Sequence, residues 1–139
     1  MRKVPFFLGV FSRDNLPIPT SYPFSLITNT DLQTESGTHW IAFYVDQHGR
    51  GMYFDSYANK PYYPEFVNYL NHNCSSGYDW NRVPLQCTTC STCGEYCCCY
   101  IILRTSDFTH EQYLQFFGDN TVSNDIIVKE LFKVVQYQI

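Results

Sequence analysis

The sequence has little charge and no basic cluster. Charged residues make up 16% of the 139 residues, 13 acids outnumber 9 bases, and no run of Lys or Arg is longer than Arg2 and Lys3. Because affinity for phosphate depends on concentrated positive charge, this balance disfavours nonspecific binding of nucleic acid. Low charge combined with an aromatic content of 18% also argues against a long disordered stretch.

Long apolar runs, internal repeats and linker-like segments are also missing. No segment approaches the roughly 20 apolar residues that cross a membrane. The apolar stretch at residues 4–11 is short, contains Pro5 and has no small-residue cleavage site, so it is not typical of a signal peptide. The length suits one hydrophobic core, and we expect residues 1–139 to form a single domain.

Cysteine, by contrast, is abundant. The chain has seven cysteines, an odd number, and Cys97, Cys98 and Cys99 are consecutive. Adjacent cysteines seldom serve a simple pairing scheme. We therefore expect free thiols in a reducing, intracellular compartment, with the three consecutive cysteines acting as small buried hydrophobic residues.

Apolar patterning predicts an α+β fold in which strands come first and helices mostly later. Residues 12–36 are rich in turn-forming types and predict one short strand at 24–28. The runs 39–45 and 52–55 predict a hairpin with a glycine-bearing turn, and 77–85 predicts another strand. Helices are predicted at 64–71, 93–103, 109–117 and 124–136.

Two of the predicted helices carry specific expectations. The helix at 93–103 is almost continuously apolar, so we expect it to be buried, with Ser91 or Thr92 as its N-terminal cap. The last helix is expected to bury one apolar face. That face consists of Ile127, Leu131, Val134 and Val135.

One ordered set of residues suffices for hydrolysis of an amide by a thiol. Cys93 lies at the first turn of a predicted helix, where the helix dipole favours a thiolate. His39 and Asp55 end two antiparallel strands at the same rim, close enough to hydrogen-bond, so that His39 would act as base and Asp55 would orient its ring. Gln86 and the backbone N–H of Cys93 are candidate donors to the oxyanion, and Gly94 leaves room for substrate.

Four segments also carry a resemblance to a known family. Residues 37–43, Gly-Thr-His-Trp-Ile-Ala-Phe, are similar to a histidine strand, and residues 52–57, Met-Tyr-Phe-Asp-Ser-Tyr, to an acidic strand. Gln86 followed by residues 93–98, Cys-Gly-Glu-Tyr-Cys-Cys, is similar to a glutamine and nucleophile block, and residues 7–9 to the segment that precedes them. Over roughly residues 6–103, the chain resembles the adenovirus-type endopeptidase, adenain, and the proteases of Polinton or Maverick elements.

The resemblance implies a papain-related fold of the adenain type, a small mixed or antiparallel sheet flanked by helices, with the nucleophile at the N-terminus of a buried helix. It implies a thiol endopeptidase that cleaves viral or element-encoded precursors, such as capsid or core proteins, during particle maturation, commonly after glycine. In that family match Cys93 is the nucleophile, His39 the base, Asp55 the orienting acid and Gln86 the oxyanion donor, with no metal or cofactor. The places of action it implies are the host nucleus or cytoplasm, and the virion.

The chain also departs from adenain. Adenain has glutamate where this chain has Asp55, whereas the SUMO-deconjugating relatives have aspartate. The chain is much shorter than adenain, which is activated by a disulfide-tethered peptide and by DNA. An activating peptide is left open, with Cys74 as a candidate tether, while the charge balance argues against activation by DNA.

Other functions remain open alongside this one. The same machinery could release a ubiquitin-like modifier such as SUMO, as an isopeptidase. The four cysteines between positions 87 and 97 match the spacing of bacterial ferredoxin ligands to an iron–sulfur cluster, and Cys-x-x-Cys pairs also hold zinc. Against a metal role, Cys98 stands where proline is expected, and the other site residues would be unexplained. An inactive binding module is disfavoured because all four site positions carry competent residues, and a redox role of Cys87 and Cys90 is left open.

Overall fold

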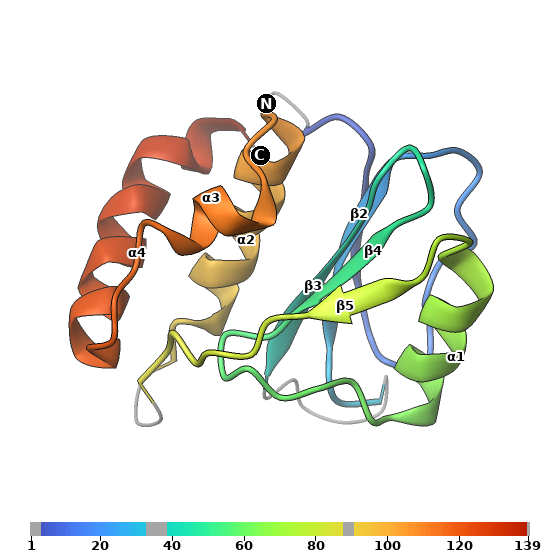
Figure 1. Ribbon diagram of the computed structural model, residues 1–139, viewed down its shortest axis with the longest axis horizontal. Helices are drawn as coiled ribbons and strands as arrows, with labels where there is room; N and C mark the ends of the chain where they lie inside the picture. The colour runs from blue at the N-terminus through green and yellow to red at the C-terminus, as the bar shows by residue number, and fades with distance from the viewer. Residues whose placement is uncertain (1–3, 33–38, 88–90, 139) are drawn as a thin grey trace.

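The fold is built on a five-stranded mixed sheet with helices on both faces (Figure 1). A computed structural model describes residues 4–32, 39–87 and 91–138. The strands lie in the order β1-β2-β3-β4-β5; β2, β3 and β4 are antiparallel neighbours, and the two outer strands pair in parallel. Their bounds are β1 Phe7–Phe11, β2 Phe24–Asn29, β3 Trp40–Val45, β4 Gly51–Phe54 and β5 Tyr78–Trp80.

The helices form two unequal groups around this sheet. Helix α1 packs on one face, and α2, α3 and α4 gather on the other (Figure 1). Their bounds are α1 Pro64–Asn73, α2 Cys93–Thr105, α3 His110–Leu114 and α4 Thr121–Val135, followed by the 3-10 turn η1 Gln136–Gln138. Within the described part of the chain, the helices are too short or too polar to span a lipid bilayer.

The strand predictions are correct in the centre of the sheet and incomplete at its edges, where one strand was missed and another was predicted too long. Strand β2 and the β3–β4 hairpin lie where they were predicted. Strand β1 was not predicted as a strand; its apolar alternation is interrupted by Gly9, whose φ is 129°. The strand predicted at 77–85 ends at Trp80, because the side chain of Asn81 pairs with the backbone of Asp55 instead of continuing the ladder.

The helix positions are confirmed, but the predicted face of α4 is only half right: Val135 is buried and Leu131 packs against the core, whereas the other two residues do not. Val134 is 73% exposed and Ile127 36%, whereas Asn124 and Asp125 are buried. The helix also begins earlier than predicted, with Asn120 as its cap. The inward face therefore combines apolar contacts with two polar side chains, and the apolar period of the sequence does not show it.

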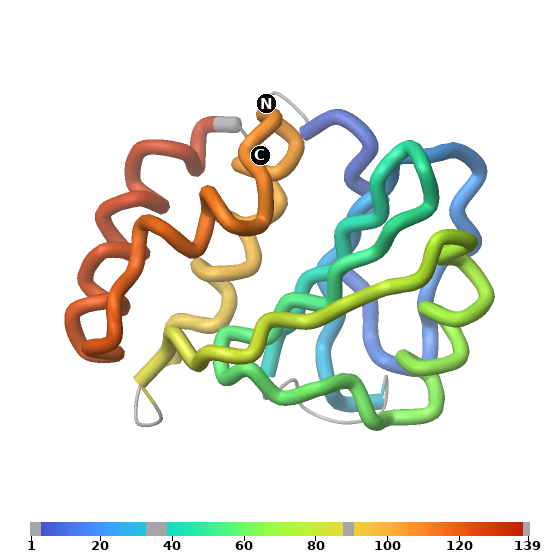
Figure 2. The backbone as a smooth tube through the Cα atoms, in the orientation of Figure 1, coloured from blue at the N-terminus to red at the C-terminus, as the bar shows by residue number. Residues whose placement is uncertain are grey.

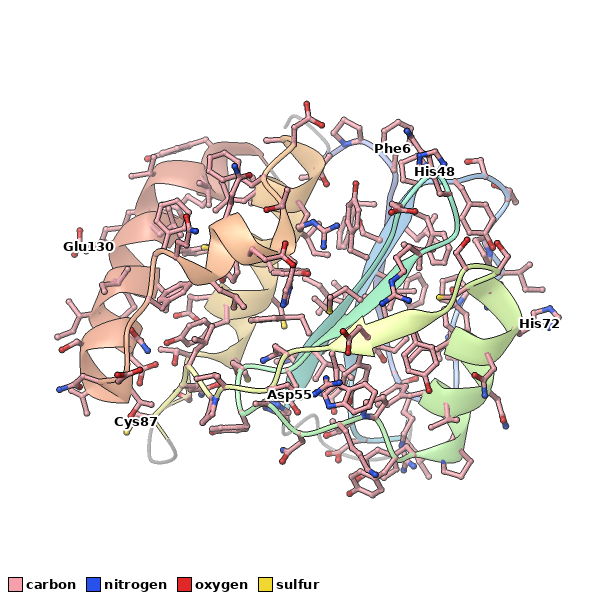
Figure 3. All side chains as sticks on the ribbon, viewed as in Figure 1. Phe6, His48, Asp55, His72, Cys87 and Glu130 are labelled. Atoms are coloured by element: carbon pink, nitrogen blue, oxygen red, sulfur yellow. The ribbon has the colours of Figure 1, made fainter. Side chains whose placement is uncertain are left out.

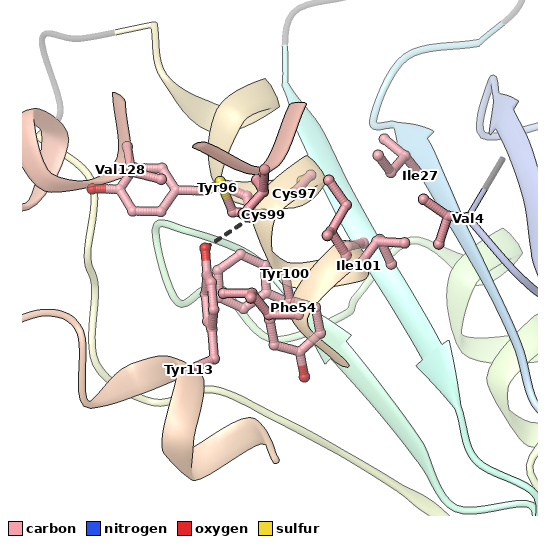
Figure 4. Close-up of a cluster of buried hydrophobic side chains, with 14 of the residues drawn as sticks. Val4, Ile27, Phe54, Tyr96, Cys97, Cys99, Tyr100, Ile101, Tyr113 and Val128 are labelled. Carbon is pink, nitrogen blue, oxygen red and sulfur yellow. Dashed lines mark hydrogen bonds between the residues drawn. The ribbon is translucent and has the colours of Figure 1, made fainter. Parts of the chain in front are cut away.

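Aromatic packing holds α2 against the sheet. The ring of Phe54 on β4 stacks on Tyr100 of α2, with centroids 4.4 Å apart, and Tyr113 of α3 meets both rings edge-on. The hydroxyl of Tyr113 donates a hydrogen bond of 2.9 Å to the backbone oxygen of Tyr96 (Figure 4). These fully buried rings fix α2 against the sheet. The orientation of the helix then sets where its N-terminus lies, at one rim of the sheet.

The segment between β5 and α2 brings the glutamine to the same rim. After β5 the chain crosses from the side of α1 to the start of α2 (Figure 2). The backbone N–H groups of Leu85 and Gln86 donate to the backbone oxygen of Ser56, at 2.8 and 3.1 Å. Residues just after β4 thus anchor the segment that leads to Cys93.

Candidate active site

His39 and Asp55 form a hydrogen-bonded pair at the rim of the sheet. His39 lies directly before β3 and Asp55 directly after β4, and Nε2 of the imidazole is 2.8 Å from Oδ1 of the carboxylate. The side chain of His39 is 15% exposed and that of Asp55 is 3% exposed. The contact expected from the hairpin is therefore present, and it leaves Nδ1 as the ring nitrogen for other partners.

Cys93 is the first residue of α2 and contacts the same imidazole. Burial raises the pKa of the thiol, but the hydrogen bond to His39 and the backbone N–H groups of Trp40 and Gly94 lower it, and the net pKa lies below the ordinary value of 9. Burial lowers the pKa of His39, whereas the hydrogen bonds to Asp55 and Cys93 raise it, and the net pKa is raised to about 9. The opposite directions favour a thiolate beside an imidazolium.

A second set of contacts fixes the ring and the carboxylate. The backbone N–H of Tyr57 donates to Oδ1 of Asp55 at 2.8 Å, and the ring of Tyr57 stacks on the imidazole with centroids 4.8 Å apart. Asn81, 3% exposed, exchanges two hydrogen bonds with the backbone of Asp55. The sequence assigned neither residue a role. Tyr57 lies in the segment 52–57 that resembles an acidic strand, whereas no pattern pointed to Asn81.

Gln86 is buried against Ser56, the residue that follows Asp55, and its amide has a defined orientation. The side chain is 1% exposed, and its Oε1 accepts a hydrogen bond from the hydroxyl of Ser56. Because the oxygen is held in this way, the NH₂ end of the amide faces away from Ser56. That orientation suits a donor role. Ser56 lies in the segment 52–57 that resembles an acidic strand, but the sequence assigned it no role.

The surroundings of the site are open beside the nucleophile and beside the imidazole. A Cβ atom at position 94 would meet no atom within 4 Å beyond its neighbours and its own helix backbone, so there is room at Gly94 for a substrate backbone. A cavity of about 270 Å³ lies next to His39 and Asp55, lined mainly by tyrosines and Lys60. A larger cavity of about 520 Å³ contains none of the four predicted site residues; it includes His48, at the far end of the hairpin from Asp55 (Figure 3).

The remaining cysteines have other surroundings. Cys74, the candidate tether, is 6% exposed and burial raises its pKa to about 11, surroundings that disfavour disulfide exchange. Cys97 is fully buried in the core, and Cys90 lies outside the described residues, as do Gly37 and Thr38 of the histidine segment. Within 4–32, 39–87 and 91–138, no group of three or more potential ligands is placed to hold a metal ion.

Comparison with solved structures identifies the fold. The crystal structure of the ASFV pS273R protease has a TM-score of 0.56 to this chain and is 22% identical; the match covers 81% of this chain and 42% of that protein. The chain shares the fold of this protease. A selenomethionine crystal structure of the same protease gives a TM-score of 0.56 at 20% identity, over 76% of this chain and 42% of that one.

A second solved structure matches over nearly the whole length. The central domain of Lpg1148, an uncharacterized protein from Legionella pneumophila, has a TM-score of 0.53 and 10% identity, covering 96% of this chain and 90% of that domain. No protein-family model matches the sequence, and no curated protein matches it. The chain spans 42% of the length of the ASFV protease. The predicted α+β class, with a mixed sheet flanked by helices, is confirmed.

Proposed function

We propose that this protein is a cysteine endopeptidase with Cys93 as nucleophile, His39 as base and Asp55 as the orienting acid. The observation that carries the proposal is geometric: Cys93, the first residue of α2, contacts the imidazole of His39, whose Nε2 lies 2.8 Å from Oδ1 of Asp55. This arrangement lowers the thiol pKa and raises the imidazole pKa. Paired shifts of this kind in opposite directions are typical of catalytic pairs. The fold shared with a viral protease supports the same reaction class.

The first chemical step is attack of the Cys93 thiolate on a peptide carbonyl. The helix N-terminus and the N–H groups of Trp40 and Gly94 stabilise the thiolate before substrate binds. As the carbonyl oxygen becomes negative, the NH₂ group of Gln86 and the backbone N–H of Cys93 donate hydrogen bonds to it. The oriented amide of Gln86 then needs little rearrangement, because Ser56 already holds its oxygen.

Proton transfers by His39 complete the cycle. The imidazolium gives its proton to the leaving amine, which departs and leaves a thioester at Cys93. Neutral His39 then takes a proton from a water molecule as the water oxygen attacks the thioester carbonyl. The carbon–sulfur bond breaks, the acid product leaves, and the thiolate of Cys93 and the imidazolium of His39 are restored. Asp55 accepts the hydrogen bond from Nε2 throughout and so directs Nδ1 toward the reacting atoms.

The substrate class is the finer part of the proposal. The resemblance of the sequence to adenain supports cleavage of viral or mobile-element precursor proteins after glycine, during particle maturation. The open space at Gly94 is consistent with a substrate backbone that approaches closely.

Active-site labelling tests the assignment directly. A glycine-terminated electrophilic peptide probe should modify Cys93 alone among the seven cysteines, as read by mass spectrometry. His39→Ala should suppress this labelling, while Cys98→Ala, which changes a half-buried cysteine on the same helix, should leave it intact. Labelling at another cysteine, or undiminished labelling in His39→Ala, would overturn the proposal.

Cleavage profiling separates the two protease classes. An endopeptidase should cut internal glycine-containing peptides and leave SUMO fusions intact, whereas an isopeptidase should show the reverse preference. Purified protein that contains stoichiometric iron or zinc would instead favour the metal-binding alternative.

A further inference from the structure

Asp125 is a buried carboxylate on α4 that contacts the chain on both sides of the nucleophile. It is 5% exposed. Its Oδ1 accepts hydrogen bonds from the hydroxyls of Thr92, at 3.0 Å, and Tyr96, at 2.8 Å. Its Oδ2 accepts one from the backbone N–H of Cys87, at 3.2 Å. Burial of a carboxylate is costly unless donors satisfy it, and these three donors do so.

Each end of this contact lies one residue from a group that the proposed reaction needs. Cys87 directly follows Gln86, and Thr92 directly precedes Cys93. Thr92 occupies the N-cap position of α2, but its hydroxyl donates to Asp125 instead of capping the helix, which differs from the predicted role. Figure 3 shows Cys87 close to the N-terminal ends of α2 and α4. Asp125 thus joins the glutamine segment to the start of the nucleophile helix.

Asn124 gives the same segment a second anchor. Its Nδ2 donates to the backbone oxygen of Leu85, at 3.2 Å, and to that of Gly118, at 2.8 Å. Its Oδ1 accepts from the backbone N–H of Gly118, at 2.9 Å. Two adjacent polar residues of α4 therefore hold residues 85–87, and these hydrogen bonds explain why both polar side chains can be buried.

We propose that Asp125 is a positioning residue that sets the separation between the Gln86 side chain and the backbone N–H of Cys93. This inference rests on the proposed function, in which those two groups stabilise the oxyanion. Donors of this kind act only when they are held in place before the reaction. Loss of the Asp125 contacts should therefore slow the chemical step more than it weakens substrate binding.

Asp125→Asn tests this proposal with a small change in shape. The amide replaces one acceptor oxygen with an NH₂ group, which cannot accept from any of the three donors. We expect kcat to fall about tenfold to a hundredfold while KM changes less than about threefold. The pH dependence of Cys93 labelling by iodoacetamide should stay as in the wild type, because the His39–Asp55 pair is untouched.

Two control variants on the same helix separate positioning from stability. Val128→Ala removes apolar packing from the buried face of α4, and Glu130→Gln removes an exposed carboxylate on its outer side (Figure 3). Both should keep the wild-type kcat at temperatures where the protein is folded. An unchanged kcat in Asp125→Asn, or an equal loss in Val128→Ala, would overturn the proposal.

A second variant and a second measurement cover the other outcomes. If Asp125→Asn does not fold, Thr92→Val removes one donor and should still lower kcat several-fold; an unchanged kcat would contradict positioning. If the wild type shows neither turnover nor selective labelling of Cys93, the proposed function fails. Amide exchange at Cys87 and Cys93 then tests the contact alone: exchange should be faster in Asp125→Asn than in Val128→Ala, and equal rates would refute it.

Discussion

Consecutive turns of α2 carry cysteines with opposite chemistry. Cys93, in the first turn, has a thiol pKa below its ordinary value, whereas burial raises the pKa of Cys97, one turn later, well above it. Both thiols are buried, Cys93 at 8% exposed and Cys97 at 0%, and burial raises the pKa of each. The difference is the partner: Cys93 meets His39 and backbone N–H groups, and Cys97 meets apolar side chains and other cysteines. A buried thiol is activated by positive neighbours, and burial alone makes it inert.

Cys93→Ala removes the activated thiol of the first turn and should have the largest effect on turnover. We expect turnover to fall by about 10⁴-fold or more, because the nucleophile cannot be replaced by its neighbours. The melting temperature should change by only a few degrees, since the substitution is small and lies at a helix end. Peptide-cleavage kinetics and thermal unfolding measure the two quantities. Wild-type turnover in this variant would mean that another residue is the nucleophile.

Gln86→Ala tests whether the segment beside the first turn contributes to the rate. Loss of one oxyanion donor should lower kcat by about 10²-fold to 10³-fold, with a smaller change in KM. Ser56→Ala is the matched variant, because it keeps the glutamine but releases its amide, and should cause a smaller loss. Separate determination of kcat and KM decides the point. A rise in KM with unchanged kcat would indicate a binding role instead.

The pH dependence of labelling sharpens the contrast between the two turns. A lowered pKa means that Cys93 is a thiolate at lower pH, so its reaction with iodoacetamide should persist below pH 9, where an ordinary thiol slows about tenfold per pH unit. Burial raises the pKa of Cys99 to about 12, so it should stay unmodified under the same conditions. Mass spectrometry of protein labelled across the pH range measures both sites.

His39→Ala provides the control for that experiment. Without the imidazole, the labelling of Cys93 should shift to higher pH and approach the profile of an ordinary thiol, since the main stabilising partner is gone. An unshifted profile would mean that the helix end and backbone N–H groups lower the thiol pKa without His39.

Cys97→Ser should have the smallest effect on the reaction and act on stability instead. A hydroxyl placed among apolar core residues should cost about 1–3 kcal/mol of unfolding free energy. Below the melting transition, the labelling rate of Cys93 should remain that of the wild type. Urea unfolding and labelling kinetics test the two statements, and a large loss of labelling in the folded variant would show that the two turns are coupled.

The parts of the candidate site that depend on local sequence patterns could be predicted from the sequence. The hairpin predicted that His39 and Asp55 meet, because antiparallel strands joined by a tight turn bring their outer ends together. The position of Cys93 followed from an apolar run that begins at that residue. The contacts of Ser56, Asn81 and Asp125 could not be predicted, since each depends on a partner distant in sequence.

The fold divides in the same way between features set by local sequence and features set by tertiary packing. The sequence by itself determined the α+β class, the central hairpin, the helix that begins at Cys93 and the residue types needed for thiol chemistry. Only the tertiary structure decided where β5 ends, which face of α4 is buried and that Asp125 joins the two segments around the nucleophile. The reason is physical: strand and helix periods arise from local backbone geometry, whereas the pairing of a buried polar group depends on which distant donors packing brings within reach.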